Sequence, residues 1–428
     1  MKEIKTFFIH TFGCQMNEYD GQRIACTLRS LGAAQVDDIE SADLIILNTC
    51  SVRAKASDKV FSYLGRIRDK KRPDALFGIV GCVAREEGAN AFRRIPELNF
   101  VLGPQSYHRL PEILENPDAR LLNIDLSGLE KFDALPAITE SELVAYIPIQ
   151  EGCDHCCTYC IVPFTRGREI SREFDAVMLD IRNAVDGGAV EICFLGQNVN
   201  GYKYNLAKLI RAAAALDGIQ RIRYTSSYPT EMTDELIALH GTEPKLLPFL
   251  NMPVQSGSES ILKRMNRPYS LDEYLGIIGK FRAVNPRIQI SSDFIVGFPG
   301  ETDSDFAATM EIARRVGFVN SYSFKYSPRP HTAAAVMENQ IPENVKKARL
   351  AELDAVLMES SLRFNESCVG QVLECLLEGP DKTKKHLIYR SPFMQQIVVP
   401  LTDGKVQPVA RIMITGANRS SLRGENAK

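Results

Sequence analysis

The stretch Gly152-Cys153-Asp154-His155-Cys156-Cys157-Thr158-Tyr159-Cys160 carries the strongest chemical signal in the chain. Within it, Cys153, Cys157 and Cys160 follow a C-x3-C-x2-C spacing inside one short loop. Three thiolates held this closely can bind three corners of a cubane iron–sulfur cluster. The fourth iron then keeps an open coordination position, which catalysis needs and a purely structural site lacks. The spacing therefore predicts a catalytic cluster in this loop.

Other residues of the loop bear on the same chemistry. Tyr159 stands just before the last cysteine, where its ring can lie against an adenine held at the open iron. A zinc site that uses His155 or Cys156 is the alternative, because cysteine pairs in cytosolic proteins often bind zinc. Zinc sites usually pair two separated knuckles, however, and the sequence has no second one. The loop closely resembles the cysteine motif of the radical S-adenosylmethionine enzymes.

Length, composition and charge indicate the class of protein that carries this loop. A chain of 428 residues is long enough for two or three domains, and 45% hydrophobic and 24% charged residues are ordinary for a soluble protein. The formal net charge of −2 gives no whole-chain argument for nucleic acid. Neither a signal peptide nor an apolar run of membrane-spanning length is visible. We therefore expect a soluble, cytoplasmic protein with no membrane partner, whose eleven cysteines serve metal or redox chemistry rather than disulfides.

Three apolar strands in the first region are each followed by a cysteine. The strands are expected at 5–10, 43–47 and 76–80, and the cysteines are Cys14, Cys50 and Cys82. Helical patterns between the strands predict an α/β fold with a doubly wound parallel sheet. Because ligands bind at the carboxyl ends of such strands, the three thiols would converge on one edge and suit a second iron–sulfur cluster. Three ordinary buried cysteines are the alternative.

The residues around these cysteines resemble the N-terminal domain of the methylthiotransferases. The matching phrases are Thr11-Phe12-Gly13-Cys14-Gln15-Met16-Asn17, Asn48-Thr49-Cys50-Ser51-Val52-Arg53 and Gly81-Cys82-Val83-Ala84. That family uses its three cysteines for an auxiliary [4Fe–4S] cluster, at which sulfur is methylated and delivered. The resemblance covers almost the whole chain. It implies two clusters, with Cys14, Cys50 and Cys82 as ligands of the auxiliary one and Cys153, Cys157 and Cys160 as ligands of the radical one.

The centre of the chain reads as a second domain. Residues 126–142 mix polar and turn-forming residues without a lasting period, and we expect them to link an N-terminal domain at 1–125 to a central domain at 143–364. Six apolar strands alternate there with helical patterns, at 143–149, 190–195, 219–225, 247–254, 288–296 and 321–326. This alternation predicts a partial TIM-type (β/α)6 barrel with its site at the strand carboxyl ends and with a connecting helix at 342–364.

Polar motifs follow four of these expected strands. After the cysteine loop, their succession looks like the cofactor-binding rim of the radical S-adenosylmethionine barrel. The resemblance implies that the Gly196-Gln197 motif and the Gly297 strand flank the amino group and adenine of S-adenosylmethionine. Polar contacts to its carboxylate or ribose would come from Gln255, Arg267 and Asp293. The full set expected to bind the cofactor is Tyr159, Gly196, Gln197, Ser226, Gln255, Arg267, Asp293 and Gly297.

Residues 365–428 form the last expected domain. Short alternating strands separated by glycines predict a small β-barrel. From Ser367 onward the segment has nine basic and five acidic residues, a net charge of +4 that leaves −6 for the rest of the chain. A basic β-barrel on an acidic enzyme indicates an RNA-binding arm and resembles the family's TRAM domain, although a merely solubilising barrel is the alternative. The candidate RNA contacts are Lys382, Lys384, Lys385, Arg390 and Arg411.

Finer phrases indicate the subclass. The segments 48–55 and 163–172, the second of which contains Thr165-Arg166-Gly167-Arg168-Glu169, resemble the MiaB type. That type acts on tRNA carrying N(6)-dimethylallyladenosine beside the anticodon. The chain departs from the family pattern at Asn251-Met252, where His-Leu is frequent, and at His331, which replaces a usual glycine. Enzymes acting on threonylcarbamoyl-adenosine tRNA or on a ribosomal protein, and a non-catalytic iron–sulfur RNA-binding sensor, are the alternatives.

The resemblance also implies a reaction. One S-adenosylmethionine would be cleaved reductively to a 5′-deoxyadenosyl radical that takes hydrogen from carbon 2 of the tRNA adenine, because that C–H bond is not acidic at neutral pH. A second S-adenosylmethionine would methylate the sulfur that the adenine then receives. We therefore expect tRNA as the substrate, an electron donor such as a flavodoxin-type reductant, and a monomer.

Overall fold

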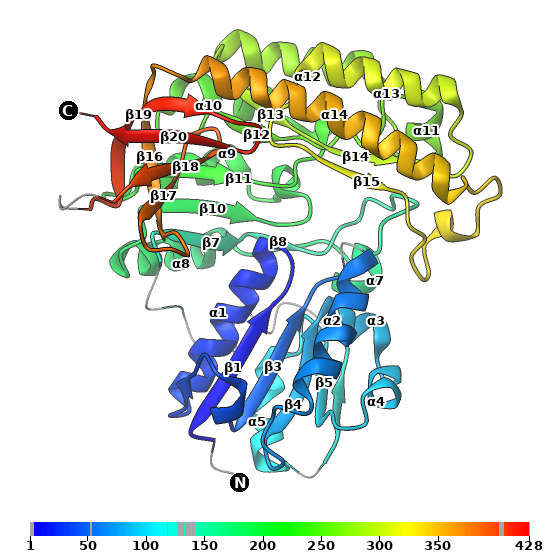
Figure 1. Cartoon of the computed structure of the whole chain (residues 1–428), viewed down its shortest axis with the longest axis vertical. Coiled ribbons are helices and arrows are strands. Elements are labelled where there is room, and N and C mark those ends of the chain that lie inside the picture. The colour runs from blue at the N-terminus through cyan, green and yellow to red at the C-terminus, as the bar shows by residue number, and fades with distance from the viewer. Residues whose placement is uncertain are drawn as a thin grey trace.

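The computed structural model describes residues 4–51, 54–117, 119–126, 132, 138, 142–401 and 406–427, without the side chains of 54–58. Most of the linker predicted at 126–142 lies outside these residues, and the boundaries of the domains stay a prediction. Figure 1 shows the N-terminal sheet below, the strands of the central region above it with their helices on top, and the C-terminal strands at one side.

The N-terminal region is a parallel sheet of six strands covered on both faces. The strand order is β2-β1-β3-β4-β5-β6, with β1 at Thr6–Thr11, β2 at Ala34–Gln35, β3 at Leu44–Thr49, β4 at Leu76–Gly81, β5 at Phe100–Leu102 and β6 at Leu121–Asn123. The central strands β3 and β4 are buried along their whole length, as parallel strands with helices on both faces are.

Two layers of helix produce this burial. On one face, α1 (Gln15–Ser30) and α5 (Leu110–Glu115) contribute to one apolar core. On the other face, α2 (Ala54–Ile67), α3 (Cys82–Glu87) and α4 (Asn90–Arg94) contribute to a second. The predicted doubly wound α/β fold is therefore confirmed, and β2, β5 and β6 add to the three strands recognised in the sequence.

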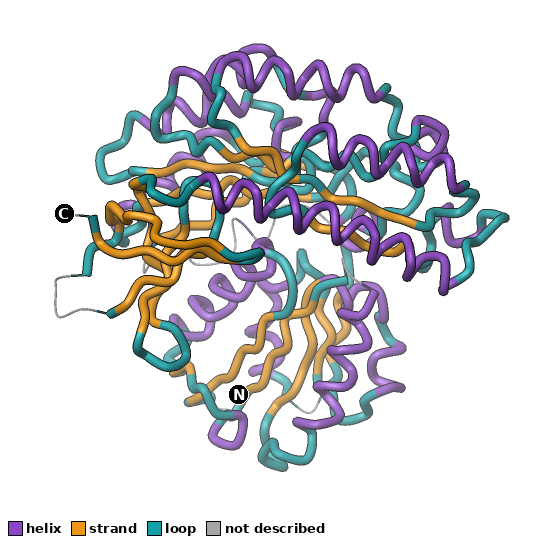
Figure 2. The backbone as a smooth tube through the Cα atoms, turned by 45° about the horizontal axis from the view of Figure 1, so that its top comes forward, coloured by secondary structure: helices purple, strands orange, loops and turns teal. Residues whose placement is uncertain are grey.

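The central region contains the expected succession of parallel strands. Its strands are β7 (Val144–Pro148), β10 (Glu191–Leu195), β11 (Arg221–Tyr224), β12 (Phe249–Asn251), β13 (Gln289–Ser291), β14 (Asp293–Val296) and β15 (Tyr322–Lys325). The helices that alternate with them are α8 (Phe174–Asp186), α9 (Leu206–Ala214), α10 (Asp234–Thr242), α11 (Glu259–Arg264), α12 (Leu271–Val284) and α13 (Asp303–Val316). Figure 2 shows this layer of helices outside the strands, as in a partial TIM-type barrel.

One strand differs from the sequence expectation. The strand predicted at 288–296 is interrupted at Ser292, so that β13 pairs with β12 whereas β14 pairs with β15. The fully buried Ser292 hydroxyl accepts a hydrogen bond from the backbone N–H of Val254, at 2.9 Å, which satisfies a donor that a regular ladder would otherwise have taken.

A long helix, α14 (Glu343–Ser367), leads into a closed five-stranded barrel of order β16-β17-β18-β20-β19. These strands are β16 (Val372–Pro380), β17 (His386–Arg390), β18 (Gln396–Pro400), β19 (Val409–Ala417) and β20 (Ser421–Asn426). The predicted C-terminal β-barrel is confirmed. Strand β20 was not recognised in the sequence because Leu422 is its only large apolar residue, yet this strand closes the barrel between β18 and β19.

Buried polar contacts fix this barrel to the central strands. The guanidinium of Arg221 on β11 pairs with Glu191 at 2.7 Å and donates to the carbonyl oxygens of Glu374 and Ser391, both at 3.1 Å. Because Arg221 is 2% exposed, these donors are satisfied only when the C-terminal barrel is docked. Across the described residues, every helix is too short or too polar to cross a membrane.

Candidate functional site at the junction of the two α/β regions

The three N-terminal cysteines stand at the ends of three neighbouring strands. Cys14 follows β1 and caps α1, Cys50 follows β3, and Cys82 begins α3 directly after β4. A hydrogen bond with Cys50 lowers the pKa of the Cys14 thiol to about 6. Gly13, with φ of 113°, allows this approach, because a Cβ there would overlap the Cys50 side chain. The fold therefore gathers three distant thiols at one edge of the sheet.

The loop of Cys153, Cys157 and Cys160 lies across from them, at the carboxyl end of β7. Backbone bonds shape it: the N–H of Cys160 donates to the carbonyl of Cys157 at 3.0 Å, and that of Cys153 donates to the carbonyl of Gly167 at 3.3 Å. Burial, followed by the charge of Cys157, raises the pKa of Cys160 to about 12, and burial, with smaller contributions from Cys160 and Cys157, raises that of Cys153 to about 12. These three thiols feel one another's charge, as the ligands of one cluster would.

A buried arginine connects the two sets of thiols. Arg166 ends α7 (Val162–Arg166), six residues after the last cysteine of the loop, and is 3% exposed. Its guanidinium pairs with Glu151 at 2.8 Å, and across the junction it pairs with Asp20 and donates to the Asn17 side chain, each at 3.1 Å. Burial opposes its charge, but Cys82 and the carboxylates hold the Arg166 pKa well above its usual range. The positive charge therefore sits beside the N-terminal thiols.

The donor sets fit iron–sulfur clusters. Within the described ranges, no three His, Cys, Asp or Glu side chains converge on one point as ligands of a single metal ion would. In a cubane cluster each thiolate binds a different iron, so the ligand sulfurs surround the cluster and do not meet. Two groups of three thiols, each with a buried cation nearby, match that requirement. Arg166 is the cation for one group, and Arg267, whose Nη1 lies 3.8 Å from the Cys157 sulfur, is the cation for the other.

The zinc alternative has less support in the geometry. The His155 ring is engaged elsewhere, because its Nε2 lies 2.8 Å from a Glu231 carboxylate oxygen and the ring stacks on Tyr228 at 3.8 Å. Cys156 is exposed, and its thiol lies 3.5 Å from the backbone carbonyl oxygen of Asp154. Neither side chain is held together with the three thiols of the loop.

Several residues expected to bind the cofactor lie around the cysteine loop. Gln197 accepts a hydrogen bond from the N–H of Gly152 at 2.6 Å, which ties the loop to the end of β10. Gly196 precedes it and packs on the Gln150 side chain. Tyr159 packs on an apolar cluster that includes Phe298. Tyr159 is thus part of the cysteine loop, Gln197 is bonded to the start of the loop, and Gly196 is next to Gln197 in the chain.

Arg267 is held by protein groups beside the cysteine loop. Its guanidinium donates to the hydroxyl of Tyr269 at 2.6 Å and to the carbonyl of Pro253 at 2.8 Å, and it lies over the Tyr228 ring at 4.7 Å. The side chain is 5% exposed. Its hydrogen bonds thus go to protein groups, which hold it against the cysteine loop.

The other predicted positions follow later strands. Ser226 comes after β11, and its positive φ of 60° turns the chain so that its carbonyl accepts from the N–H of Val199. The N–H of Gln255 donates to the carbonyl of Asp293 at 2.9 Å, so these two residues lie together. Gly297 follows β14 with φ of 69° and donates its N–H to a Glu301 carboxylate oxygen at 2.8 Å.

A polar cluster at the mouth of the central region was not recognised in the sequence. Asn198 donates to Glu231 at 2.7 Å and to Glu169 at 3.3 Å, and Glu231 pairs with His155. Burial raises the pKa of the Glu169 carboxyl, whereas hydrogen bonds from His155 and Asn198 outweigh burial and lower that of Glu231. These four residues lie in four separate segments, so only the fold joins them. Glu231 had no signal in the sequence, whereas His155, Glu169 and Asn198 each stand in or beside a motif recognised for another reason.

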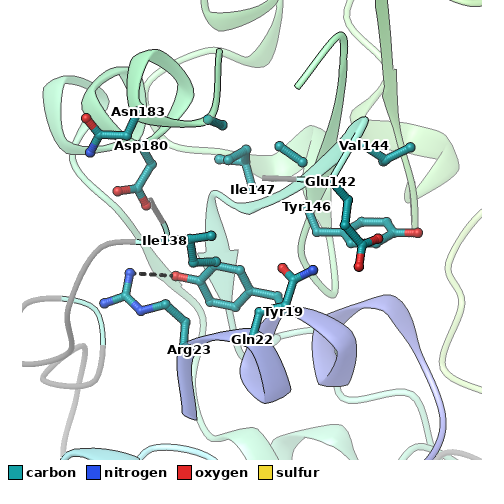
Figure 3. Close-up of a pocket in the computed structure, with 12 residues that line it drawn as sticks. Tyr19, Gln22, Arg23, Ile138, Glu142, Val144, Tyr146, Ile147, Asp180 and Asn183 are labelled. Carbon is teal, nitrogen blue, oxygen red and sulfur yellow. Dashed lines mark hydrogen bonds between the residues drawn. The ribbon is translucent and has the colours of Figure 1, made fainter. Parts of the chain in front are cut away.

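A small cavity marks the back of the junction. Its volume is about 20 Å³, close to the space that one water molecule needs. Figure 3 shows Tyr19 and Arg23 of α1 facing Asp180 of α8 across it, with the Arg23 guanidinium donating to the Tyr19 hydroxyl at 3.2 Å. The two regions thus pack closely here, with room for little more than a water molecule.

Comparisons with known proteins agree with this architecture. Residues 6–103 match the model of "Uncharacterized protein family UPF0004", and residues 147–313 match that of the Radical SAM superfamily. A protein of Sphingopyxis alaskensis named tRNA-2-methylthio-N(6)-dimethylallyladenosine synthase is 45% identical over 98% of this chain and 97% of its own length. Its namesake from Zymomonas mobilis is 42% identical over 99% of this chain and 97% of its own.

The chain belongs to the tRNA-2-methylthio-N(6)-dimethylallyladenosine synthase family. The family is a branch of the radical S-adenosylmethionine enzymes, and its members match this chain from end to end. Among solved structures, a radical S-adenosylmethionine methyltransferase from Kitasatospora setae, bound to tryptophan and an S-adenosylmethionine analogue, superposes with a TM-score of 0.55 at 12% identity. It covers 88% of this chain and 79% of its own, and at that identity it supports the fold alone.

Proposed function

We propose that this protein is a tRNA methylthiotransferase that converts N(6)-dimethylallyladenosine beside the anticodon into its 2-methylthio derivative. The observation that carries the proposal is the junction at Arg166, where one buried cation joins the end of the Cys153–Cys160 loop to the sheet edge of Cys14, Cys50 and Cys82. A reaction that generates a substrate radical at one site and delivers sulfur from another needs the two at a fixed spacing.

The cysteines are proposed as the ligands of two [4Fe–4S] clusters. Cys153, Cys157 and Cys160 would hold one of them, and the N-terminal set would hold the other. When bound, the clusters and S-adenosylmethionine supply one-electron chemistry that can remove hydrogen from an unactivated carbon. The chain itself supplies the geometry: Gln197 fixes the start of the cysteine loop, and Arg166 holds both regions in register.

The cofactor is proposed to bind beside the loop. Tyr159 lies in the loop and Gln197 is bonded to its start, and we propose that backbone groups at the end of β10 reach the amino group of the cofactor. Contacts from Ser226, Gln255, Arg267, Asp293 and Gly297 are part of the same proposal. For Arg267, whose donors go to protein groups, the role we propose is to hold the Cys157 thiol in place.

The C-terminal barrel is proposed as the TRAM-type arm that binds the RNA. Lys382, Lys384 and Lys385 are exposed on the turn between β16 and β17, where they can reach phosphates. Arg411 is exposed as well. Arg390 pairs with Glu378 at 2.6 Å, and we expect it to contribute less. A flavodoxin-type electron donor, a monomeric state and a cytoplasmic location complete the proposal.

The test is an anaerobic assay of the reconstituted protein with reductant and S-adenosylmethionine. It uses tRNA bearing dimethylallyladenosine and, separately, tRNA bearing threonylcarbamoyl-adenosine, with nucleosides identified by mass spectrometry. A methylthio mass gain on the first tRNA alone is the expected result. A gain on the second alone would move the protein to the sister group. Formation of 5′-deoxyadenosine with no gain on either would refute the tRNA substrate and favour a ribosomal protein.

A further inference from the structure

An exposed aromatic side chain follows the cysteine loop, on a short helix that packs against the N-terminal region. Phe164 lies on the short helix α7, four residues after Cys160, and is 44% exposed. Helix α3, which begins at Cys82, packs against α7, and the Arg85 guanidinium of α3 donates to the Phe164 carbonyl oxygen at 3.3 Å. Phe164 is thus an exposed apolar ring on a helix at the contact between the two α/β regions.

A second ring meets it from the other side. His331 lies in the loop that follows β15, and its ring centroid is 5.8 Å from that of Phe164, with a tilt of 38°. The same loop is joined to the cysteine loop, because the N–H of Ala334 donates to the carbonyl of Thr158 at 2.8 Å. The two rings therefore come from separate segments that are each fixed to the site.

The backbone at His331 is unfavourable for this residue. Its φ of 67° lies in the left-handed region, which glycine adopts freely and other residues adopt at a cost. Glycine is the residue that suits this conformation, and this chain has histidine there. The strained backbone places the exposed His331 ring in contact with Phe164. Backbone strain of this kind is characteristic of ligand-binding positions.

The surroundings are suited to a nucleic acid. Arg85 lies beside Phe164, and Arg329 lies close enough to Glu86 to oppose the rise that burial causes in the pKa of that carboxyl. His331 acts on Glu86 in the same direction. A basic group beside exposed rings, here Arg85 beside Phe164 and His331, is typical of surfaces that bind unpaired nucleotides, in which bases stack on the rings and phosphates meet the cations. Arg329 is only 9% exposed and acts on Glu86 instead.

We propose that Phe164 and His331 form the surface on which an unpaired base of the anticodon loop stacks, next to the adenosine that is modified. This inference rests on the proposed function, because it takes tRNA as the substrate. Both rings are exposed, so they can receive a base that flanks the target adenosine, whereas the target adenosine itself must reach the thiols. Stacking would hold the loop open and direct the target base inward.

The experiment measures binding of an anticodon-arm RNA hairpin in which 2-aminopurine replaces, in turn, each base that flanks the target adenosine. The wild-type protein should quench the fluorescence at one position by stacking. Phe164→Ala should weaken binding by about 5- to 150-fold, the range for loss of one base–aromatic stack, and should abolish the quenching. Tyr322→Ala is the matched control, because Tyr322 is 54% exposed at the opposite end of β15.

A second variant separates stacking from folding. His331→Gly relieves the left-handed strain, so it should melt at an equal or higher temperature than the wild type and still bind the hairpin less tightly. Unchanged affinity and quenching in both Phe164→Ala and His331→Gly would overturn the inference. Failure of the wild-type protein to bind the hairpin would instead refute the proposed tRNA substrate, and with it the inference.

Discussion

Replacing Arg166 by methionine should destabilise the protein more than any other single change at the junction. The substitution keeps the length of the side chain but removes its charge. Asp20 and Glu151, each 1% exposed, then stay buried without the cation that both of them contact. Arg168→Met is the matched control: it lies two residues away in the same motif and pairs with Asp154, but its side chain is 86% exposed.

The magnitude follows from distance and burial. At an effective dielectric constant of about 20, charges separated by the observed 2.8 Å and 3.1 Å attract each other by on the order of 5 kcal/mol. Desolvation of the three groups offsets much of this attraction in the wild type. Removing Arg166 removes the attraction, while Asp20 and Glu151 still carry the cost of having been taken out of water. We therefore expect the free energy of unfolding to fall by about 3–5 kcal/mol. The exposed pair of the control is solvated and screened, and little change is expected there.

Urea unfolding of the two variants, followed by circular dichroism, provides the measurement. A double-mutant cycle with Asp20→Asn tests whether the ion pair itself is responsible. If it is, Asp20→Asn should lower the free energy of unfolding less in the Arg166→Met protein than in the wild type, with a coupling free energy of roughly 0.5–3 kcal/mol. Limited proteolysis should also cleave the Arg166→Met protein faster between its two regions. Equal stability of the Arg166 and Arg168 variants, or strictly additive effects in the cycle, would refute the reasoning.

Three further predictions concern single residues. Cys157→Ala should abolish 5′-deoxyadenosine formation, whereas Cys50→Ala should keep it and lose methylthio insertion; the exposed Cys156 is the control, and its alanine variant should keep both activities. Gly152→Ala should lower the free energy of unfolding by more than about 2 kcal/mol, because φ is 78° and a Cβ would overlap a backbone carbonyl oxygen. It should also prevent reconstitution of the loop's cluster, which the absorption spectrum of the cluster would show. Burial lowers the pKa of His240 from 6.5 to about 3. The unfolded chain therefore binds the extra proton between these pH values, so stability should fall as pH drops below 6.5 and level off near 3, and a flatter profile is expected for His240→Gln than for wild type.

The sequence by itself determined the chemistry that three local patterns encode. The C-x3-C-x2-C spacing is complete within one loop, so no knowledge of tertiary structure is needed to predict its cluster. Alternating apolar strands and helices indicated both α/β regions, because the hydrophobic period reports local burial. The same reasoning placed Cys14, Cys50 and Cys82 at strand ends, since strand carboxyl ends in a parallel sheet share an edge.

Only the tertiary structure decided which distant side chains meet. Arg166 was read as part of a motif, but its partner Asp20 lies 146 residues earlier and stands in a helix pattern with no special feature. Asn198, Glu231 and His155 come from three separate loops, and β20 is too polar to show a strand period. Local patterns report how a residue packs within its own element, whereas these contacts depend on how elements dock. The burial of whole apolar faces determines which elements dock against one another. A charge that docking buries, such as that of Arg166, is then stable only if the opposing element supplies its partners.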